Sequence, residues 1–267
     1  MRPSIIVFAG KVGDHNDRAM AAAPLVGAEI SRRLDTEPVL IGNRRPATNH
    51  GWAHELSDGE PELRALAAVV DESWSAGTRP VVIAGRNTVA LATLPVLARR
   101  HPGAVMVWIG ADTSLNTPST TRTGYLGGMV LSAASGLWKT PLGDGLPLSH
   151  IVFCGTRDVE PVEHLLIESG LVAHVHQPGQ PLTDLVDAIG GRSVFVHFAC
   201  DALDPGIVPT DYSIAGGYTL EQAADLIAML ASHNVLGVEV TELEIPYRGA
   251  DTTSVPVIVD LLEPLIR

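Results

Sequence analysis

The chain has 267 residues, with 30 Asp plus Glu against 18 Lys plus Arg, and a formal net charge of −12. A chain this acidic, without a run of Lys and Arg, is a poor partner for nucleic-acid phosphates, which attract basic patches. Anionic membrane surfaces are excluded for the same reason, and the apolar runs are shorter than the roughly 20 residues that cross a bilayer. We therefore expect a soluble protein with no nucleic-acid or membrane partner.

Eight apolar runs rich in Val and Ile recur along the chain, and their continuity is typical of parallel strands that are covered on both faces. These predicted strands are Ile5 to Phe8, Pro38 to Ile41, Pro80 to Ala84, Ala104 to Ile109, His150 to Cys154, Val172 to His176, Ser193 to Ala199 and Val235 to Leu243. Cys154 and Cys200 each lie in an apolar run, which favours buried thiols in a reducing, cytoplasmic compartment.

Segments with helical spacing separate most of these runs. They are Met20 to Arg33, Glu60 to Ser75, Thr88 to Arg100, Pro161 to Ser169 and Leu220 to Ser232. Thr219 with Gln222 is typical of a helix start, and Gly170 of a helix end. Alternating strands and helices predict a parallel sheet with helices on both faces, and eight strands in residues 1–267 leave no room for a second domain.

In sheets of this kind, ligands bind beyond the carboxyl ends of the strands, so the residues just after each run decide the function. Polar segments follow the third, fourth, fifth, seventh and eighth runs. They are Ala84 to Thr88 (AGRNT), Gly110 to Pro118 (GADTSLNTP), Cys154 to Pro161 (CGTRDVEP), His197 to Pro205 (HFACDALDP) and Glu239 to Leu243 (EVTEL).

Taken in this order and spacing, the five segments resemble the ureohydrolase family, which comprises arginase, agmatinase and formiminoglutamase. The resemblance implies an arginase-like three-layer α/β/α fold with an eight-stranded parallel sheet. It also implies hydrolysis of a guanidine or related C–N bond by hydroxide that bridges two manganese ions. A homo-oligomer, trimeric or hexameric, is the assembly that the family implies.

The family's six metal ligands do not survive intact in this chain. The resemblance places them at Asn87, Gly110, Asp112, Ser114, Ala199 and Asp201. Two carboxylates and an amide cannot hold two adjacent dications against hydration, so we predict no dinuclear manganese centre and no cofactor. One alternative is a single weakly held ion at Asp112, Asp201 and Asn87; another is an ordinary manganese ureohydrolase, which would require ligands that the sequence lacks.

Four residues are candidates for catalysis without metal. Alternation along the seventh run puts His197 on the same side as Asp201, where a histidine near a carboxylate can act as general acid or base. Asp112 would supply a second carboxyl group, and Arg86 would pair with Asp112 or Asp201, or stabilise an oxyanion. The alternative for His197 is a buried histidine that forms hydrogen bonds inside the sheet.

Five residues are candidates for ligand binding. Glu242 matches the family glutamate that binds the substrate guanidinium, although a structural ion pair with Arg86 or Arg157 explains it equally well. Asn116 and Thr123 match the loop that binds the substrate's amino-acid end, and the alternative for them is a turn of small polar residues. Asn87 and Ser114 stand at two of the metal-ligand positions that the resemblance implies, and their polar side chains predict a pocket that remains polar.

Two functions of different class follow. The first, which the polar pocket favours slightly, is a repurposed, metal-independent enzyme for a small amino-acid-derived guanidine, amidine or amide. The second is a non-catalytic relative that serves as a ligand sensor or as the partner subunit of an active enzyme. Fold resemblance does not decide between them.

Overall fold

The strands of the sheet begin and end close to the predicted apolar runs. The computed structural model describes residues 1–246 and 251–267. Its strands are β1 (Pro3–Phe8), β2 (Val39–Ile41), β3 (Arg79–Ala84), β4 (Val105–Ile109), β5 (Ile151–Cys154), β6 (His174–His176), β7 (Val194–Ala199) and β8 (Val235–Thr241). Every residue of β3, β4, β5, β7 and β8 is buried, which explains why these strands read as continuous apolar runs.

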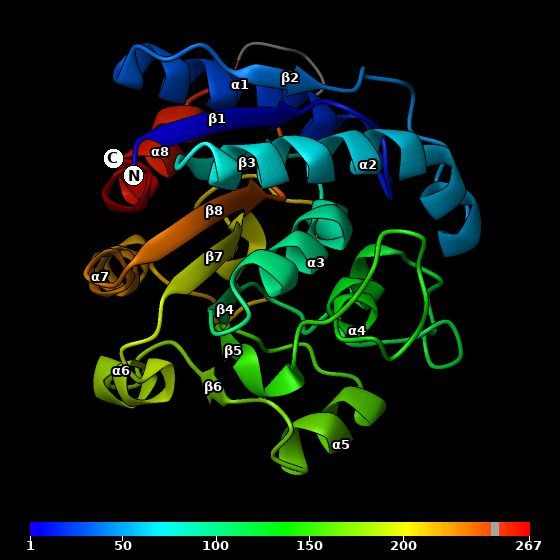
Figure 1. Ribbon diagram of the computed structural model, residues 1–267, viewed down its shortest axis with the longest axis vertical. Helices are drawn as coiled ribbons and strands as arrows, with labels where there is room; N and C mark the ends of the chain where they lie inside the picture. The colour runs from blue at the N-terminus through cyan, green and yellow to red at the C-terminus, as the bar shows by residue number, and fades with distance from the viewer. Residues whose placement is uncertain (247–250) are drawn as a thin grey trace.

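All eight strands are parallel and form one sheet in the order β2-β1-β3-β8-β7-β4-β5-β6. From β1 the chain passes outward to β2, returns to β3 on the other side of β1, and then passes to β4, β5 and β6. Strands β7 and β8 lie between β3 and β4 (Figure 1). The carboxyl ends of β3, β8, β7 and β4 therefore lie side by side at the centre of the sheet, where the strand order reverses.

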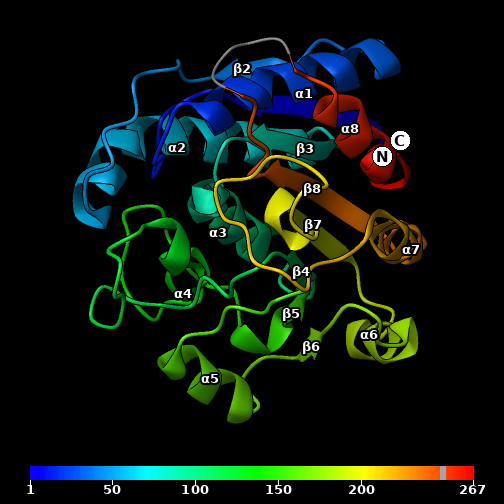
Figure 2. The same cartoon turned by 180° about the vertical axis from the view of Figure 1, so that it is seen from behind.

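Helices cover both faces of the sheet, as Figures 1 and 2 show from opposite sides. They are α1 (Arg18–Leu34), α2 (Trp52–Ser75), α3 (Ala90–Arg100), α4 (Val130–Ala134), α5 (Pro161–Glu168), α6 (Leu182–Ile189), α7 (Leu220–Ala231) and α8 (Ser254–Ile266). One buried apolar cluster joins α1, α6, α7 and α8 to the sheet, and the other joins α2, α3 and α4 to the opposite face. The predicted three-layer α/β/α sandwich is confirmed.

The helices α4, α6 and α8 were not singled out by the sequence, and α2 begins at Trp52 instead of Glu60. The sequence did not predict the first part of α2 because Gly59 and Pro61 are poor helix formers, yet both lie within the helix. Among the described residues, no helix is both long and apolar enough to cross a membrane.

The start of α7 is fixed by a reciprocal pair of hydrogen bonds. The backbone N–H of Gln222 donates to the Thr219 hydroxyl at 3.2 Å, and the backbone N–H of Thr219 donates to the Gln222 side-chain oxygen at 3.0 Å. Both bonds satisfy N–H groups that would otherwise have no partner in the first turn. The predicted helix start at Thr219 is therefore confirmed.

We expect Thr219→Ala to lower the free energy of unfolding by about 1 kcal/mol, because the cap is lost while the helix still packs on the sheet. Urea denaturation measures the effect. Thr183→Ala, in the first turn of α6, is the control, since Thr183 is exposed and its hydroxyl only reaches the neighbouring Asp184. An equal loss in both variants would contradict the role of the cap.

Candidate functional site

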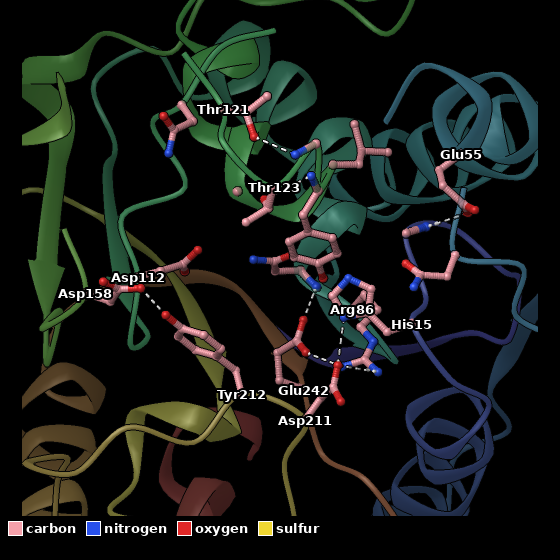
Figure 3. Close-up of a pocket in the computed structure, with 18 of the residues that line it drawn as sticks. His15, Glu55, Arg86, Asp112, Thr121, Thr123, Asp158, Asp211, Tyr212 and Glu242 are labelled. Carbon is pink, nitrogen blue, oxygen red and sulfur yellow. Dashed lines mark hydrogen bonds and ion pairs between the residues drawn. The ribbon is translucent and has the colours of Figure 1, made fainter. Parts of the chain in front are cut away.

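A cavity of about 620 Å³ opens at the carboxyl ends of the central strands. Each of these strands contributes side chains to its wall: Arg86 and Asn87 follow β3, Asp112 follows β4, Asp201 follows β7, and Glu242 follows β8. Figure 3 shows Asp112, Asp158 and Tyr212 on one side of the cavity and Arg86, Glu242 and Asp211 on the other. The site lies where the parallel topology predicts it.

Carboxyl groups outnumber basic groups in the wall of this cavity. The acidic side chains that line it are Glu55, Asp112, Asp158, Glu160, Glu163, Asp201, Asp211 and Glu242, and the basic ones are His15, His50 and Arg86. A recess with this balance attracts cations and repels anions.

The guanidinium of Arg86 is the centre of a buried ion-pair network. It donates from Nη1 to Glu242 at 2.8 Å and from Nη2 to Glu244 at 3.0 Å. Asp14 and Asp211 each lie 3.5 Å from one of its nitrogens. Burial disfavours the charge of Arg86, but the nearby groups of Glu242, Tyr125 and Asp14 outweigh it, so the pKa of Arg86 is raised. Arg86 does not pair with Asp112 or Asp201, contrary to expectation; the ion pair with Glu242 that the sequence left open is present.

The backbone holds Glu242 in a fixed orientation. Its φ is +63°, a left-handed conformation that is uncommon for a residue with a side chain, and its N–H donates to the carbonyl of Gly85 at 3.0 Å. One carboxylate oxygen accepts from the N–H of Asn87 at 2.8 Å, and the other accepts from Arg86. Both oxygens of Glu242 therefore already have partners within the protein.

Asp112 and Asp201 form the acidic half of the cavity. Asp201 lies in the short turn after β7, and its carboxylate accepts from the N–H of Ala111 at 3.1 Å. Burial, with a smaller effect of the Glu242 charge, raises the pKa of Asp201 to about 7. Burial and the charge of Asp201 also raise the pKa of Asp112 well above its ordinary value. Near neutral pH the carboxyl group of Asp201 can therefore both give and accept a proton.

The loops around this half hold Asp201 and its neighbours in place. Arg157 donates from Nη2 to the backbone carbonyls of Asp201 and Ile214, both at 2.7 Å, and so ties the turn after β7 to the following loop. The hydroxyl of Tyr212 donates to the carboxylate of Asp158 (Figure 3). Arg157 is thus a structural clamp and not the partner of Glu242.

The loop after β4 brings Asn116 and Thr123 to the cavity wall, as the sequence predicts. Asn116 is buried, and its side-chain oxygen accepts from Thr120 at 3.0 Å. Asn87 also lines the cavity and is buried; its side-chain nitrogen reaches Ser114 at 3.3 Å, but its oxygen has no hydrogen-bond partner. Ser114 itself is buried outside the lining, where its hydroxyl donates to Asp112 at 3.3 Å.

His197 lies inside the sheet and does not line the cavity. It pairs in register with Trp108 on β4 and Glu239 on β8. Its ring stacks on Trp108 with a centroid distance of 3.7 Å, Nδ1 lies 2.8 Å from Glu239, and Nε2 lies 3.3 Å from Thr241. Because both nitrogens are engaged and the side chain is fully buried, the expected acid-base role at the cavity is corrected in favour of the buried-histidine alternative.

The side chains present do not fit two manganese ions. Gly110 and Ala199 offer no donor atom, and the hydroxyl of Ser114 is turned to Asp112. Within residues 1–246 and 251–267, no group of three or more His, Cys, Asp and Glu is arranged to hold a metal ion. Asp112 and Asp201 alone supply too few hard ligands for a dinuclear centre.

Sequence reasoning missed three of the four carboxylates around Arg86. Asp14 follows β1, Asp211 belongs to the loop after the short turn Cys200–Ala202, and Glu244 comes two residues after Glu242. A carboxylate after β1 was a weak signal for a site at this edge of the sheet. Asp211 and Glu244 gave no signal, because irregular segments carry no periodicity that predicts where a side chain points.

Asp201→Asn tests the buried carboxyl group through the pH dependence of stability. The unfolded chain releases the Asp201 proton near pH 3.8, whereas the folded protein holds it up to about pH 7, so this group lowers stability as pH rises between these values. Asn does not ionise, so we expect the variant to gain at least about 1 kcal/mol relative to the wild type between pH 4 and pH 8. Urea denaturation at both pH values measures the gain; Asp144→Asn, at an exposed carboxylate, should show none.

Comparison with known proteins agrees with this architecture. The model of the arginase family matches residues 25–265. The N(omega)-hydroxy-L-arginine amidinohydrolase of Streptomyces lavendulae is 34% identical over 262 residues, which cover 97% of this chain and 96% of that protein. An arginase of Eremothecium gossypii is 29% identical over 239 residues, which cover 82% of this chain and 57% of that protein.

Solved structures show the same fold. The crystal structure of arginase from Bacillus subtilis superposes with a TM-score of 0.83 at 20% identity and covers 100% of this chain and 98% of that one. The native structure of the Bacillus caldovelox arginase superposes with a TM-score of 0.79 at 22% identity, over 99% of this chain and 98% of that one. With the family match over residues 25–265, these findings show that the chain belongs to the arginase family.

Proposed function

We propose that the chain binds a small, positively charged compound derived from an amino acid, and that it does so without a dinuclear manganese centre. The observation that carries this proposal is the pair Asp112 and Asp201 at the cavity wall: none of the ion pairs in the described residues includes either carboxylate. A ligand ammonium or amidinium group would supply the missing positive charge and lower the cost of burying these carboxylates.

The far wall of the cavity supports a ligand with an amino-acid end. Asn116 and Thr123 offer an amide and a hydroxyl there. The name of the Streptomyces lavendulae relative describes action on N(omega)-hydroxy-L-arginine, an amino acid with a basic side chain. A ligand of this general class matches the acidic lining.

Binding without turnover is the function that the geometry supports best. Of the four residues predicted for catalysis, Arg86 is engaged by carboxylates of the protein and His197 is enclosed in the sheet. Of the four, only Asp112 and Asp201 line the cavity without an ion-pair partner among the described residues. The chain would then serve as a ligand sensor or as the partner of an active subunit. A trimeric or hexameric assembly and a cytoplasmic location also stay predictions.

Metal-independent catalysis is the second candidate, and the pKa of Asp201 favours it. A carboxyl group with a pKa of about 7 next to another whose pKa is raised can pass a proton to a leaving amine and take one from water. This mechanism would suit an amide or amidine, and it needs no group beyond Asp112 and Asp201.

Ligand binding is tested by thermal shift and calorimetry with ornithine, agmatine, N-hydroxyarginine and the neutral analogue norvaline. We expect the cationic compounds to raise Tm, and Asp112→Asn to weaken their binding by about tenfold or more, because a charge-assisted contact is lost. Asp144→Asn is the matched control at an exposed carboxylate. Equal binding of norvaline, or unchanged binding by Asp112→Asn, would contradict the proposal.

The absence of a dinuclear centre is tested by metal analysis and by turnover. After incubation with Mn²⁺ and gel filtration we expect less than one manganese ion per chain, because too few ligands converge. Two retained ions per chain would refute this part of the proposal. Turnover of any cationic compound in the presence of a chelator, lost in Asp201→Asn, would establish the catalytic candidate over binding alone.

A further inference from the structure

One guanidinium group faces four carboxylates at the edge of the cavity. Arg86 is 2% exposed, and its nitrogens lie 2.8 Å from Glu242, 3.0 Å from Glu244, and 3.5 Å from Asp14 and Asp211. Arg86, Asp211 and Glu242 all line the cavity, so this cluster is a part of its wall and not a separate core feature (Figure 3).

We propose that the Arg86 side chain occupies a guanidinium-binding subsite of this cavity and excludes guanidino ligands from it. Arg86 is thereby a specificity-determining residue, because the positive group of a ligand would have to pair with Asp112 and Asp201 instead. The consequence for ligand choice rests on the proposed binding function, whereas the occupied subsite itself does not.

The arrangement of acceptors around Arg86 matches a planar guanidinium. Nη1 and Nη2 donate to two different carboxylates, and Nε faces a third, Asp14. A guanidinium presents several donors in a fixed plane, while an ammonium is a compact charge that cannot reach such separated acceptors at once. The acceptors are also held in place without Arg86, because the second oxygen of Glu242 is bound by the N–H of Asn87.

The cluster needs this cation. Arg18 lies 2.6 Å from Glu244 and 3.6 Å from Asp211, and His15 lies 2.9 Å from Asp211, but both side chains are partly exposed, unlike that of Arg86. Asp14 and Glu242 have Arg86 as their cationic partner among the described residues. Burial raises the pKa of Asp14 to about 7, and the charge of Arg86 acts against this rise, so the ionised form of Asp14 depends on Arg86.

Removal of the Arg86 side chain should therefore create a vacancy that is open to the cavity and lined by fixed carboxylates. An external guanidinium ion fits that vacancy in charge, size and donor geometry. In the wild type, the Arg86 side chain occupies this position, so the ion cannot bind there.

The experiment uses Arg86→Ala and measures Tm with millimolar guanidinium chloride, with ammonium chloride and sodium chloride at equal ionic strength. At about ten times its Kd, guanidinium should raise the Tm of the variant by about 3 °C above the value in sodium chloride. We expect ammonium to give less than half this shift, and the wild type to show none.

Arg79→Ala is the matched control. Arg79 is also buried, but its guanidinium donates to the main-chain oxygens of Ile266 and Arg267, and none of the ion pairs in the described residues joins it to an Asp or Glu side chain. Its loss should destabilise the protein without making it respond to guanidinium. A second control is Glu242→Gln combined with Arg86→Ala, which should bind guanidinium at least about tenfold more weakly, since one acceptor charge is gone.

If Arg86→Ala does not fold unaided, the yield of soluble, helical protein after refolding from urea replaces Tm as the readout. Recovery in guanidinium but not in sodium chloride would support the proposal. It is overturned if guanidinium and sodium act alike on Arg86→Ala in both assays, or if Arg79→Ala responds as strongly. None of these readouts needs the physiological ligand, so failure of the proposed binding function would be seen separately.

Discussion

The burial of carboxylates at the carboxyl edge of the sheet is the constraint on which the site depends. Each buried carboxylate must find a cation, accept hydrogen bonds or keep its proton. All three solutions occur side by side: Glu242 pairs with Arg86, Glu163 accepts from the N–H groups of Leu115 and Glu160, and Asp201 has a pKa of about 7. As a result, the carboxylates on the Arg86 side of the cavity have a cationic partner, whereas Asp112 and Asp201 on the other side do not have one among the described residues.

This division is consistent with a polar pocket in an arginase-family chain whose Gly110 and Ala199 offer no donor atom. The raised pKa values of Asp112 and Asp201 mean that these two buried carboxyl groups hold their protons to higher pH than exposed ones do. Across the cavity, Arg86 supplies the positive charge from the protein itself. The pocket is therefore polar on both sides, and Arg86 provides positive charge on one of them.

The strands and the parallel sheet could be predicted from the sequence, because a buried parallel strand has a continuous apolar run, whereas the helices α4, α6 and α8 could not. The strand ends indicated where the site lies, and the family resemblance singled out Asp112, Asp201 and Asn116, which do line the cavity. The partners of side chains could not be predicted: alternation placed His197 on the side of Asp201, but only the register of β7 between β4 and β8 reveals that neighbouring strands enclose its ring. Contacts between irregular loops, such as Arg86 with Asp211, leave no periodic signal at all.

The polar contact between His197 and Glu239 has a consequence for assembly of the sheet. These two residues face each other only when β7 and β8 are adjacent in the observed alignment, with Trp108 of β4 against the ring from the other side. A shift of one residue would turn each side chain to the opposite face and leave an acid and an imidazole in apolar surroundings without each other. The pair therefore favours the observed alignment of β7 with β8 over one that is shifted by a residue.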